Sequence, residues 1–404
     1  MALQAAKESI TLLRNDDNIL PLSPTSTLRV ALVGPLANSS SVMEGAKPDY
    51  DAKHIVGVLE GLTALASSST IEYSSGLLSV KDNNTLTKEY KQAVAIASQA
   101  DVAIVVVGID ASVEKEALDR TDVLLPGAQQ QLILDIATNR AAAGHTKQGG
   151  MVVVLINGGP ISCDWLRTST LLPIAVVEAF EGGQEAGSAL GATLYGFNNP
   201  SGVLPYSLYY ENATVESVVP FTQFDMRPEG SYPGRTYRFS VAPTLWEFGH
   251  GLSYTTFQLT WSNKDDDDGQ KRAVHDVHDV HDVQRVHRPG IQHMVQVTNT
   301  GAVAGAKVVH AFVTRRSNER HVALKAPSPP IKSLYGMKKV YLNPGETKTV
   351  VFSTKSMSGS KPFGTTLRNG SVVLVPGRVT ITVGVGEERI EQEFTMVGEE
   401  MFLL

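Results

Sequence analysis

Between residues 28 and 195, short apolar runs alternate with segments of helical periodicity. The runs at residues 29–34, 102–107 and 151–156 are apolar at nearly every position. Such runs are typical of strands in a parallel sheet whose two faces are both covered. Further strands are expected at 70–73 and 174–177, and helices or helix ends at 60–66, 89–100, 129–136 and 183–194. This alternation predicts an α/β sandwich, in which an open, mostly parallel sheet carries helices on both faces.

The pattern changes after this region. Residues 206–254 are rich in aromatic residues, Pro and Gly, which indicates an ordered connector rather than a flexible linker. Strands are then expected at 292–297, 307–313, 338–342, 348–352 and 378–385. Short strands separated by turn signals predict an all-β sandwich. We therefore expect an α/β domain over residues 28–245 and a β-sandwich domain over 246–404.

The first residues have no apolar core of the kind that marks a signal peptide. Residues 1–16 instead predict an amphipathic helix, with Ala5, Ile10, Leu12 and Leu13 along one side. Residues 1–27 are accordingly interpreted as a linker helix that continues from sequence further upstream.

Composition excludes several classes of function. The 404 residues carry a formal net charge of −6, which gives no electrostatic footprint for nucleic acid or an anionic membrane. No apolar run approaches the ~20 residues needed to span a bilayer. The single cysteine, Cys163, allows no internal disulfide and is expected to be a small buried side chain. No phosphate-binding glycine loop and no G-x-S-x-G elbow is present, so we expect neither a nucleotide cofactor nor serine hydrolase chemistry.

A low-complexity insert occupies residues 264–290. It begins with four aspartates and carries three His-Asp-Val units, at His275, His278 and His281. A His-rich tract can bind metal, but spacing by three in so polar a segment favours a disordered repeat expansion. We expect no metal site there.

Carboxylates are concentrated in the loop that follows the strand at 102–107. They are Asp110, Glu114, Glu116, Asp119 and Asp122. Ligands of open α/β sheets bind outside the carboxyl ends of the strands, where this loop lies; the alternative is a solvated acidic loop without chemistry. Two glutamates this close in sequence cannot flank a scissile bond from opposite sides, so at most one is a proton donor and its partner lies elsewhere. Asp164, before Trp165, is expected in a turn rather than as a nucleophile.

Several motifs occur together in a characteristic order. They are Gly108-Ile109-Asp110, Val113-Glu114-Lys115-Glu116, Asp119-Arg120, Leu125-Pro126-Gly127 and Gln130, with Ala5–Asp16, Ile19–Leu22, Tyr232–Phe239, Phe248–Phe257, Val297–Gly301 and Pro344–Glu346. This set closely resembles glycoside hydrolase family 3, in its β-xylosidase-like branch. The resemblance covers nearly the whole chain except the His-Asp-Val insert.

The resemblance implies a three-part enzyme. A (β/α)8 barrel carries an aspartate nucleophile, an α/β sandwich supplies the acid/base glutamate, and a fibronectin type III-like domain follows. This sequence begins at the family's barrel-to-sandwich linker, so the barrel is expected to be absent. Glu114 is expected to be the acid/base residue, in preference to Glu116, and Asp119 and Arg120 to orient the loop as a salt-bridged pair. Residues 44–50 depart from the family's Gly-Asn-Tyr-like segment near the substrate.

The implied activity is retaining, exo-acting hydrolysis of β-linked xylosyl or arabinosyl residues in oligosaccharides. The two carboxyls of such an enzyme lie ~5–5.5 Å apart, and the acid needs a raised pKa, for which Glu116 and Asp110 are candidate causes. The sugar, the substrate-binding residues and the oligomeric state remain open, and a non-catalytic carbohydrate-binding or scaffold protein is the alternative. Sequons favour secretion of the full-length protein and stand at Asn38, Asn83, Asn212 and Asn369.

Overall fold

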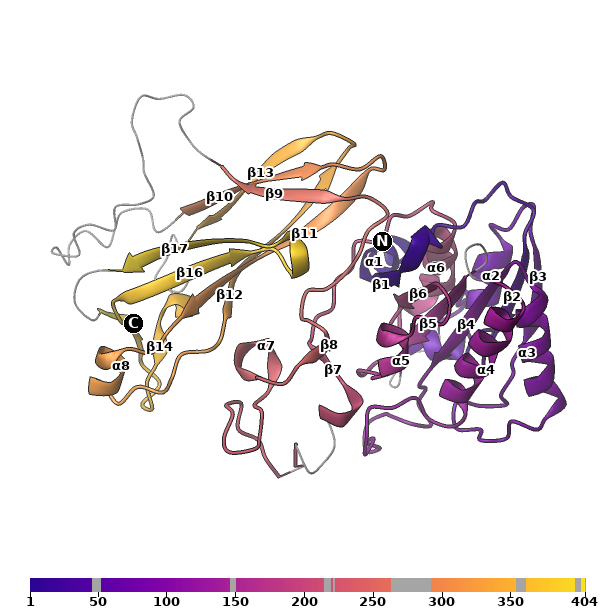
Figure 1. The fold of residues 1–404 in the computed structure, drawn as a ribbon, viewed down its shortest axis with the longest axis horizontal. Helices are drawn as coiled ribbons and strands as arrows, with labels where there is room; N and C mark the ends of the chain where they lie inside the picture. The colour runs from indigo at the N-terminus through magenta and orange to yellow at the C-terminus, as the bar shows by residue number, and fades with distance from the viewer. Residues whose placement is uncertain are drawn as a thin grey trace. The chain divides into compact units, whose positions relative to one another are not determined.

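The computed structural model describes residues 1–45, 52–145, 150–213, 219–220, 222–262, 292–353, 361–396 and 401–403. Contacts divide the chain into two compact units. The first unit is Met1–Thr222 with Pro243–Tyr254, and the second is Gln223–Ala242 with Thr255–Leu404 (Figure 1). Residues 223–242, expected in the first domain, therefore group with the second. The His-Asp-Val insert lies outside the described residues.

A six-stranded sheet forms the centre of the first unit, in the order β1-β6-β5-β4-β2-β3. Strands β2 to β6 run parallel, and β1 pairs antiparallel with β6 at one edge. The predicted mostly parallel sheet is thus confirmed. The strands are β1 (Thr11–Asn15), β2 (Arg29–Val33), β3 (Thr70–Ser74), β4 (Val102–Gly108), β5 (Met151–Ile156) and β6 (Ile174–Glu178).

Helices cover both faces of this sheet (Figure 1). Successive side chains of a strand point to opposite faces. Val105 accordingly packs in the core shared with α3, α4 and α5, and Ile104 in the core shared with α1, α2 and α6. The helices are α1 (Ala2–Ser9), α2 (Val58–Thr63), α3 (Lys88–Gln99), α4 (Gln129–Ala142), α5 (Asp164–Thr168) and α6 (Ala186–Leu194), and the short 3-10 turns are Asp16–Asn18, Ser41–Glu44, Gly183–Glu185 and Glu211–Ala213.

The prediction of one helix over residues 1–16 is wrong beyond Ser9. Helix α1 ends at Ser9, and the following residues form β1, in which Leu12 lies opposite Val177 of β6. Leu12 and Leu13 are both buried, but they pack in the two cores on opposite faces of the sheet. A free edge of the sheet supplied hydrogen-bond partners that local periodicity cannot reveal. Residues 1–27 are consequently part of the first unit.

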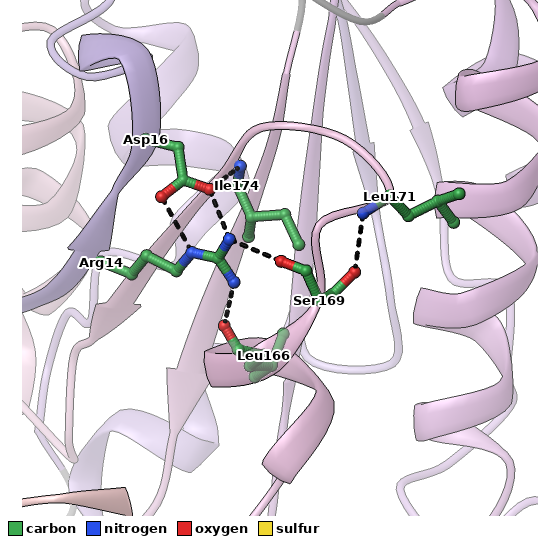
Figure 2. A network of polar contacts seen from close by, with 6 residues as sticks. All are labelled: Arg14, Asp16, Leu166, Ser169, Leu171 and Ile174. Atoms are coloured by element: carbon green, nitrogen blue, oxygen red, sulfur yellow. Dashed lines mark hydrogen bonds and ion pairs between the residues drawn. The ribbon is translucent and has the colours of Figure 1, made fainter.

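Arg14 links β1 to helix α5 and to Ser169, which follows that helix (Figure 2). Its guanidinium donates to the carbonyl oxygens of Leu166 at 2.8 Å and Ser169 at 2.7 Å. It also donates to Asp16 at 2.9 Å, and Asp16 accepts the backbone N–H of Ile174 at 3.1 Å. Charge-assisted bonds of this kind are stronger than neutral ones, so this network fixes the edge strand.

The second unit consists of antiparallel strands around a separate apolar core that includes Val297, Ala311 and Ile381. One sheet has the order β13-β10-β9, another β12-β11-β16-β17 and a small third β14-β15-β18. The strands are β9 (Phe257–Trp261), β10 (Gln292–Asn299), β11 (Gly305–Arg315), β12 (Ser333–Leu342), β13 (Thr347–Ser353), β14 (Thr365–Thr366), β15 (Val372–Leu374), β16 (Gly377–Val383), β17 (Ile390–Met396) and β18 (Met401–Leu403).

Short elements complete the two units. In the first unit, β7 (Leu208–Tyr209) pairs with β8 (Thr244–Trp246). In the second unit lie the helices α7 (Thr236–Phe239) and α8 (Glu319–Ala323), and the 3-10 turns Lys361–Phe363 and Gly386–Glu388.

Helices α2 and α6 approach each other closely because glycines line their contact. A Cβ placed on Gly61 would lie 2.0 Å from the carbonyl oxygen of Gly187, and one on Gly191 would lie 2.4 Å from the carbonyl oxygen of Gly61. No side chain fits at these distances without separating the two helices.

We predict that Gly61→Ala destabilises the first unit although alanine is the better helix former. Overpacking against backbone costs about 1–3 kcal/mol, which outweighs the propensity gain of up to about 1 kcal/mol. Urea unfolding measures the effect. Ser188→Ala in α6 is the matched control and should change stability by less than about 0.5 kcal/mol. Equal stability of Gly61→Ala and the wild type would contradict the close packing.

Candidate active site

The candidate site lies at the carboxyl ends of three neighbouring parallel strands. Glu114 follows β4, the pair Gly158-Gly159 follows β5, and Glu181 follows β6. Because these strands pair in parallel, the loops leave the sheet at one edge. This edge is where open α/β folds bind ligands, as the sequence predicted for the acidic loop.

Glu114 is held by an ion pair with Arg120. The Nε of Arg120 lies 2.6 Å from the Glu114 Oε2, and the Arg120 Nη2 donates to the carbonyl of Pro160 at 3.0 Å. The Arg120 side chain is 10% exposed and that of Glu114 35%, so the carboxyl keeps access to solvent. The prediction that Arg120 pairs with Asp119 is wrong. Asp119 is exposed, and the loop folds back so that Glu114, six residues earlier, reaches the guanidinium.

Glu116 lies in a tight turn of the same loop. Lys115 and Leu118 exchange backbone hydrogen bonds of 3.0 and 2.9 Å, and Ala117 between them has a φ of +64°. Glu116 is exposed. The two glutamates of the loop therefore differ in burial: Glu114 is half-buried against an arginine, whereas Glu116 is exposed.

The Gly158-Gly159 turn packs directly against two carboxylates. A Cβ on Gly159 would lie 2.7 Å from an oxygen of Glu114, and one on Gly158 would lie 2.9 Å from an oxygen of Glu181. Burial, and then the charge of Glu114, raise the pKa of Glu181. The carboxylate that faces Glu114 is thus Glu181 of the β6 loop. From the sequence, Glu116 and Asp110 were the expected acidic neighbours of Glu114, and Glu181 was not identified. The Asp110 side chain instead accepts the backbone N–H of Ser112 at 2.9 Å.

A second group that sequence reasoning missed lies beneath this edge. Glu178, the last residue of β6, is fully buried, as is Asn157 after β5. Burial raises the pKa of Glu178 to about 8, against the opposing effects of the Phe180 N–H and the Asn157 side chain. Burial likewise raises the pKa of Tyr206 well above its usual range. The signal in the sequence that could have identified Glu178 is its position as a charged residue at the end of an otherwise apolar strand.

The remaining candidates have structural roles. Asp164 and Glu211 cap each other's backbone, with the Asp164 Oδ1 accepting the Glu211 N–H at 3.1 Å. Asp164 is the first residue of helix α5, whereas the sequence had predicted a turn at this position. Cys163 is buried as expected, and burial raises the pKa of its thiol to about 12. Residues 44–50 are the segment that departs from the family's Gly-Asn-Tyr-like pattern. The Glu44 carboxyl accepts the Ala52 N–H at 3.1 Å, and residues 46–50 lie outside the described residues.

Within the described ranges, no group of three or more His, Cys, Asp or Glu side chains is arranged to hold a metal ion. In that same part of the chain, no helix is long and apolar enough to cross a membrane.

Comparison with known families identifies this arrangement. The model of the glycosyl hydrolase family 3 C-terminal domain matches residues 10–254, more than half of the chain. The chain belongs to glycosyl hydrolase family 3. The resemblance seen in the sequence motifs is confirmed at this level, and the first unit is the family 3 α/β sandwich.

Relatives within family 3 include β-xylosidases. The chain is 36% identical over 259 residues to β-D-xylosidase 1 of Arabidopsis thaliana, covering 64% of this chain and 31% of that protein. It is 33% identical over 416 residues to the probable exo-1,4-β-xylosidase bxlB of Aspergillus fumigatus, covering 100% of this chain and 48% of that protein. The solved family 3 exo-β-xylosidase XlnD superposes with a TM-score of 0.81 at 26% identity, over 100% of this chain and 49% of that one. The chain thus spans half or less of these relatives.

We predict that Glu178→Gln changes how the stability of this family 3 domain depends on pH. The pKa of Glu178 is raised from 4.5 to about 8 on folding, so the folded state holds a proton that the unfolded state releases. The part of the folding stability that depends on Glu178 is therefore greatest below about pH 4.5. It falls as the pH rises to about 8 and does not change above that.

Urea unfolding at pH 5, 6.5 and 8.5 measures this effect. The wild type should lose stability relative to Glu178→Gln across the series, by an amount on the order of a few kcal/mol. Glu89→Gln, at an exposed position of α3, is the control and should follow the wild type. Parallel pH profiles for Glu178→Gln and the wild type would show that Glu178 does not titrate in this window.

Proposed function

We propose that this chain is part of a retaining, exo-acting, β-xylosidase-like glycoside hydrolase and supplies its acid/base residue, Glu114. The observation that carries the proposal is the placement of Glu114 in a chain of family 3: the carboxyl lies at the ligand-binding edge of the sheet, oriented by Arg120 and open to solvent. The substrates are oligosaccharides with β-linked xylosyl or arabinosyl residues at their non-reducing ends. No cofactor takes part.

The mechanism needs a second carboxylate. In the proposed enzyme an aspartate on a (β/α)8 barrel outside these 404 residues attacks the anomeric carbon, while Glu114 protonates the leaving oxygen. Glu114 then removes a proton from the water that releases the sugar. The relatives named above are about twice as long as this chain or longer, which leaves room for such a barrel.

Two further parts of the proposal concern the second unit and the destination of the protein. We propose that the antiparallel sheets after Thr255 form a fibronectin type III-like domain, supported by their common apolar core. We also propose that the full-length protein is secreted. All four sequon asparagines, Asn38, Asn83, Asn212 and Asn369, are exposed and accessible to glycosylation.

We predict that Glu114→Gln lowers hydrolysis of aryl β-xylosides in a leaving-group-dependent way. The assay uses a chimera that joins this chain to the barrel of the structurally similar exo-β-xylosidase. Loss of a general acid should reduce kcat/KM about 10²- to 10⁴-fold for 4-nitrophenyl β-xyloside. It should have a much smaller effect for the 2,4-dinitrophenyl glycoside, whose leaving group needs no protonation. Azide should restore turnover as a glycosyl azide.

The matched control for this experiment is Glu116→Gln, two residues away in the same loop. It should retain most activity on both substrates. If Glu116→Gln shows the leaving-group dependence and Glu114→Gln does not, the proton donor is Glu116. If neither change alters kcat/KM of the active chimera on either substrate, the loop has no acid/base role and the carbohydrate-binding alternative gains support.

Glycosylation gives a separate prediction. Expression through a eukaryotic secretory route should add glycans at the exposed sequons, seen as a mass decrease on treatment with peptide-N-glycosidase. Asn→Gln changes at all four positions should abolish that decrease. A secreted protein of unmodified mass would contradict this part of the proposal.

A further inference from the structure

Glu114 and Arg120 lie in a long loop with few apolar contacts. The loop consists of residues 109–128, between the end of β4 and the start of α4, and is called the β4–α4 loop below. Connections from strand to helix in α/β folds usually have about 2–6 residues. The ends of the loop are buried, but no residue from Asp110 to Leu124 is. The position of the proposed proton donor therefore depends on the contacts that hold this loop.

Gln129, the first residue of α4, binds both ends of the loop. Its side chain is fully buried. The Oε1 accepts the backbone N–H of Gly108 at 2.8 Å. The Nε2 donates to the carbonyl oxygens of Gly108 at 2.9 Å and Pro126 at 3.1 Å, and to that of Val80, in the loop after β3, at 3.0 Å. One amide thus joins the residue before the loop, a residue near its end and the neighbouring loop.

The surroundings of the Gln129 amide fix its orientation. Its two N–H groups face three carbonyl oxygens, and its oxygen faces one backbone N–H. Turning the amide over would place its oxygen against three acceptors and its N–H groups against a donor. A methionine of similar length would preserve much of the packing but would remove all of these bonds and leave buried backbone groups without the amide.

A hydrogen-bonded segment connects Gly108 to Glu114. The N–H of Ile109 donates to the last residue of β5 at 3.0 Å. The Asp110 carbonyl then accepts the backbone N–H groups of Val113 at 2.9 Å and Glu114 at 3.2 Å. Because successive parts of this segment are bonded in this way, a displacement of Gly108 displaces Glu114.

The other end of the loop is held in the same region. The Ala128 N–H donates at 2.8 Å to the carbonyl of Asp82, in the loop after β3. Farther from the sheet, the ion pair of Glu114 and Arg120 joins the two sides of the loop at 2.6 Å. The loop is thus joined across at two levels, by Gln129 at its base and by the ion pair beyond it. Only the first of these is fully buried.

We propose that Gln129 is a positioning residue for the proposed proton donor. By joining Gly108, Pro126 and Val80, its amide keeps the base of the β4–α4 loop closed and so holds Glu114 at the edge of the sheet. The catalytic meaning of this inference rests on the proposed acid/base role of Glu114. The structural part, in which Gln129 holds the loop, stands by itself.

The next residue of α4 provides a matched control. Residues 129–131 are three successive glutamines, of which Gln129 alone is buried. Gln130 is half-buried, and its side chain forms no hydrogen bond with any part of the chain that the structure describes. Gln130→Met therefore makes the same chemical change as Gln129→Met without removing a contact of the loop.

Hydrogen exchange in the 404-residue chain tests the structural part. In Gln129→Met, amides bonded within the loop, such as those of Val113 and Leu118, should exchange about 10- to 10²-fold faster than in the wild type, because the loop opens more easily. Helix α6, on the other face of the sheet, should be accelerated less, and Gln130→Met should match the wild type. Equal acceleration of the loop and α6, or an effect of the same size in Gln130→Met, would overturn the proposal.

A second measurement needs no variant. With glutamine side chains labelled by ¹⁵N in the wild type, the Nε2 protons of Gln129 should exchange with solvent about 10²-fold more slowly than those of Gln130. Equal exchange rates would overturn the proposal, because a side chain that holds the base of the loop is shielded from water. This comparison decides the structural part even if Gln129→Met does not fold.

Kinetics of the active chimera test the catalytic part. Gln129→Met should lower kcat/KM for 4-nitrophenyl β-xyloside about 10- to 10²-fold, because a displaced acid protonates the leaving group poorly. For the 2,4-dinitrophenyl glycoside the loss should be less than about threefold. Equal losses on both substrates would overturn the positioning role. If Glu114→Gln shows no leaving-group dependence, the proposed function is at fault, and the exchange rates still decide whether Gln129 holds the loop.

Discussion

The parallel pairing of β4, β5 and β6 is the constraint on which the site depends. Val105 of β4 lies opposite Val153 of β5, which in turn lies opposite Val176 of β6. All three strands are buried along their whole length, so both of their faces must be covered. Crossover helices provide this cover and return each strand in the same direction. The three following loops consequently converge at one edge, although they are far apart in sequence.

Close approach between backbone and carboxylates shapes this edge. The turn after β5 has no side chains at Gly158 and Gly159, and carboxyl oxygens of Glu181 and Glu114 occupy the space. Arg120 supplies the positive charge that keeps Glu114 in place beside another carboxylate. The guanidinium suits this role because it can bind a carboxylate and a backbone carbonyl at once. The loop after β4 is therefore held by these specific polar contacts together with the packing of Val113 against the apolar cores of the sheet.

Glu178 is the least favourable element of this arrangement. A buried carboxyl reduces stability at neutral pH, whereas the other residues of β6 contribute apolar packing. Proteins commonly break a packing rule at functional sites, at some cost in stability. Glu178 lies at the point where the hydrophobic core ends and the polar edge begins.

The sequence by itself determined the α/β class, the core strands and the family. Consecutive apolar residues at 102–107 and 151–156 leave few alternatives to buried strands, and the ordered motifs around Glu114 are specific. Only the tertiary structure decided that residues 11–15 form an edge strand, that Arg120 pairs with Glu114 rather than Asp119, and that Glu181 and Glu178 belong to the site. The physical reason is that these facts depend on contacts between distant segments. Periodicity reports the local burial of a residue, whereas the partner of a charged side chain is set by where the fold places both.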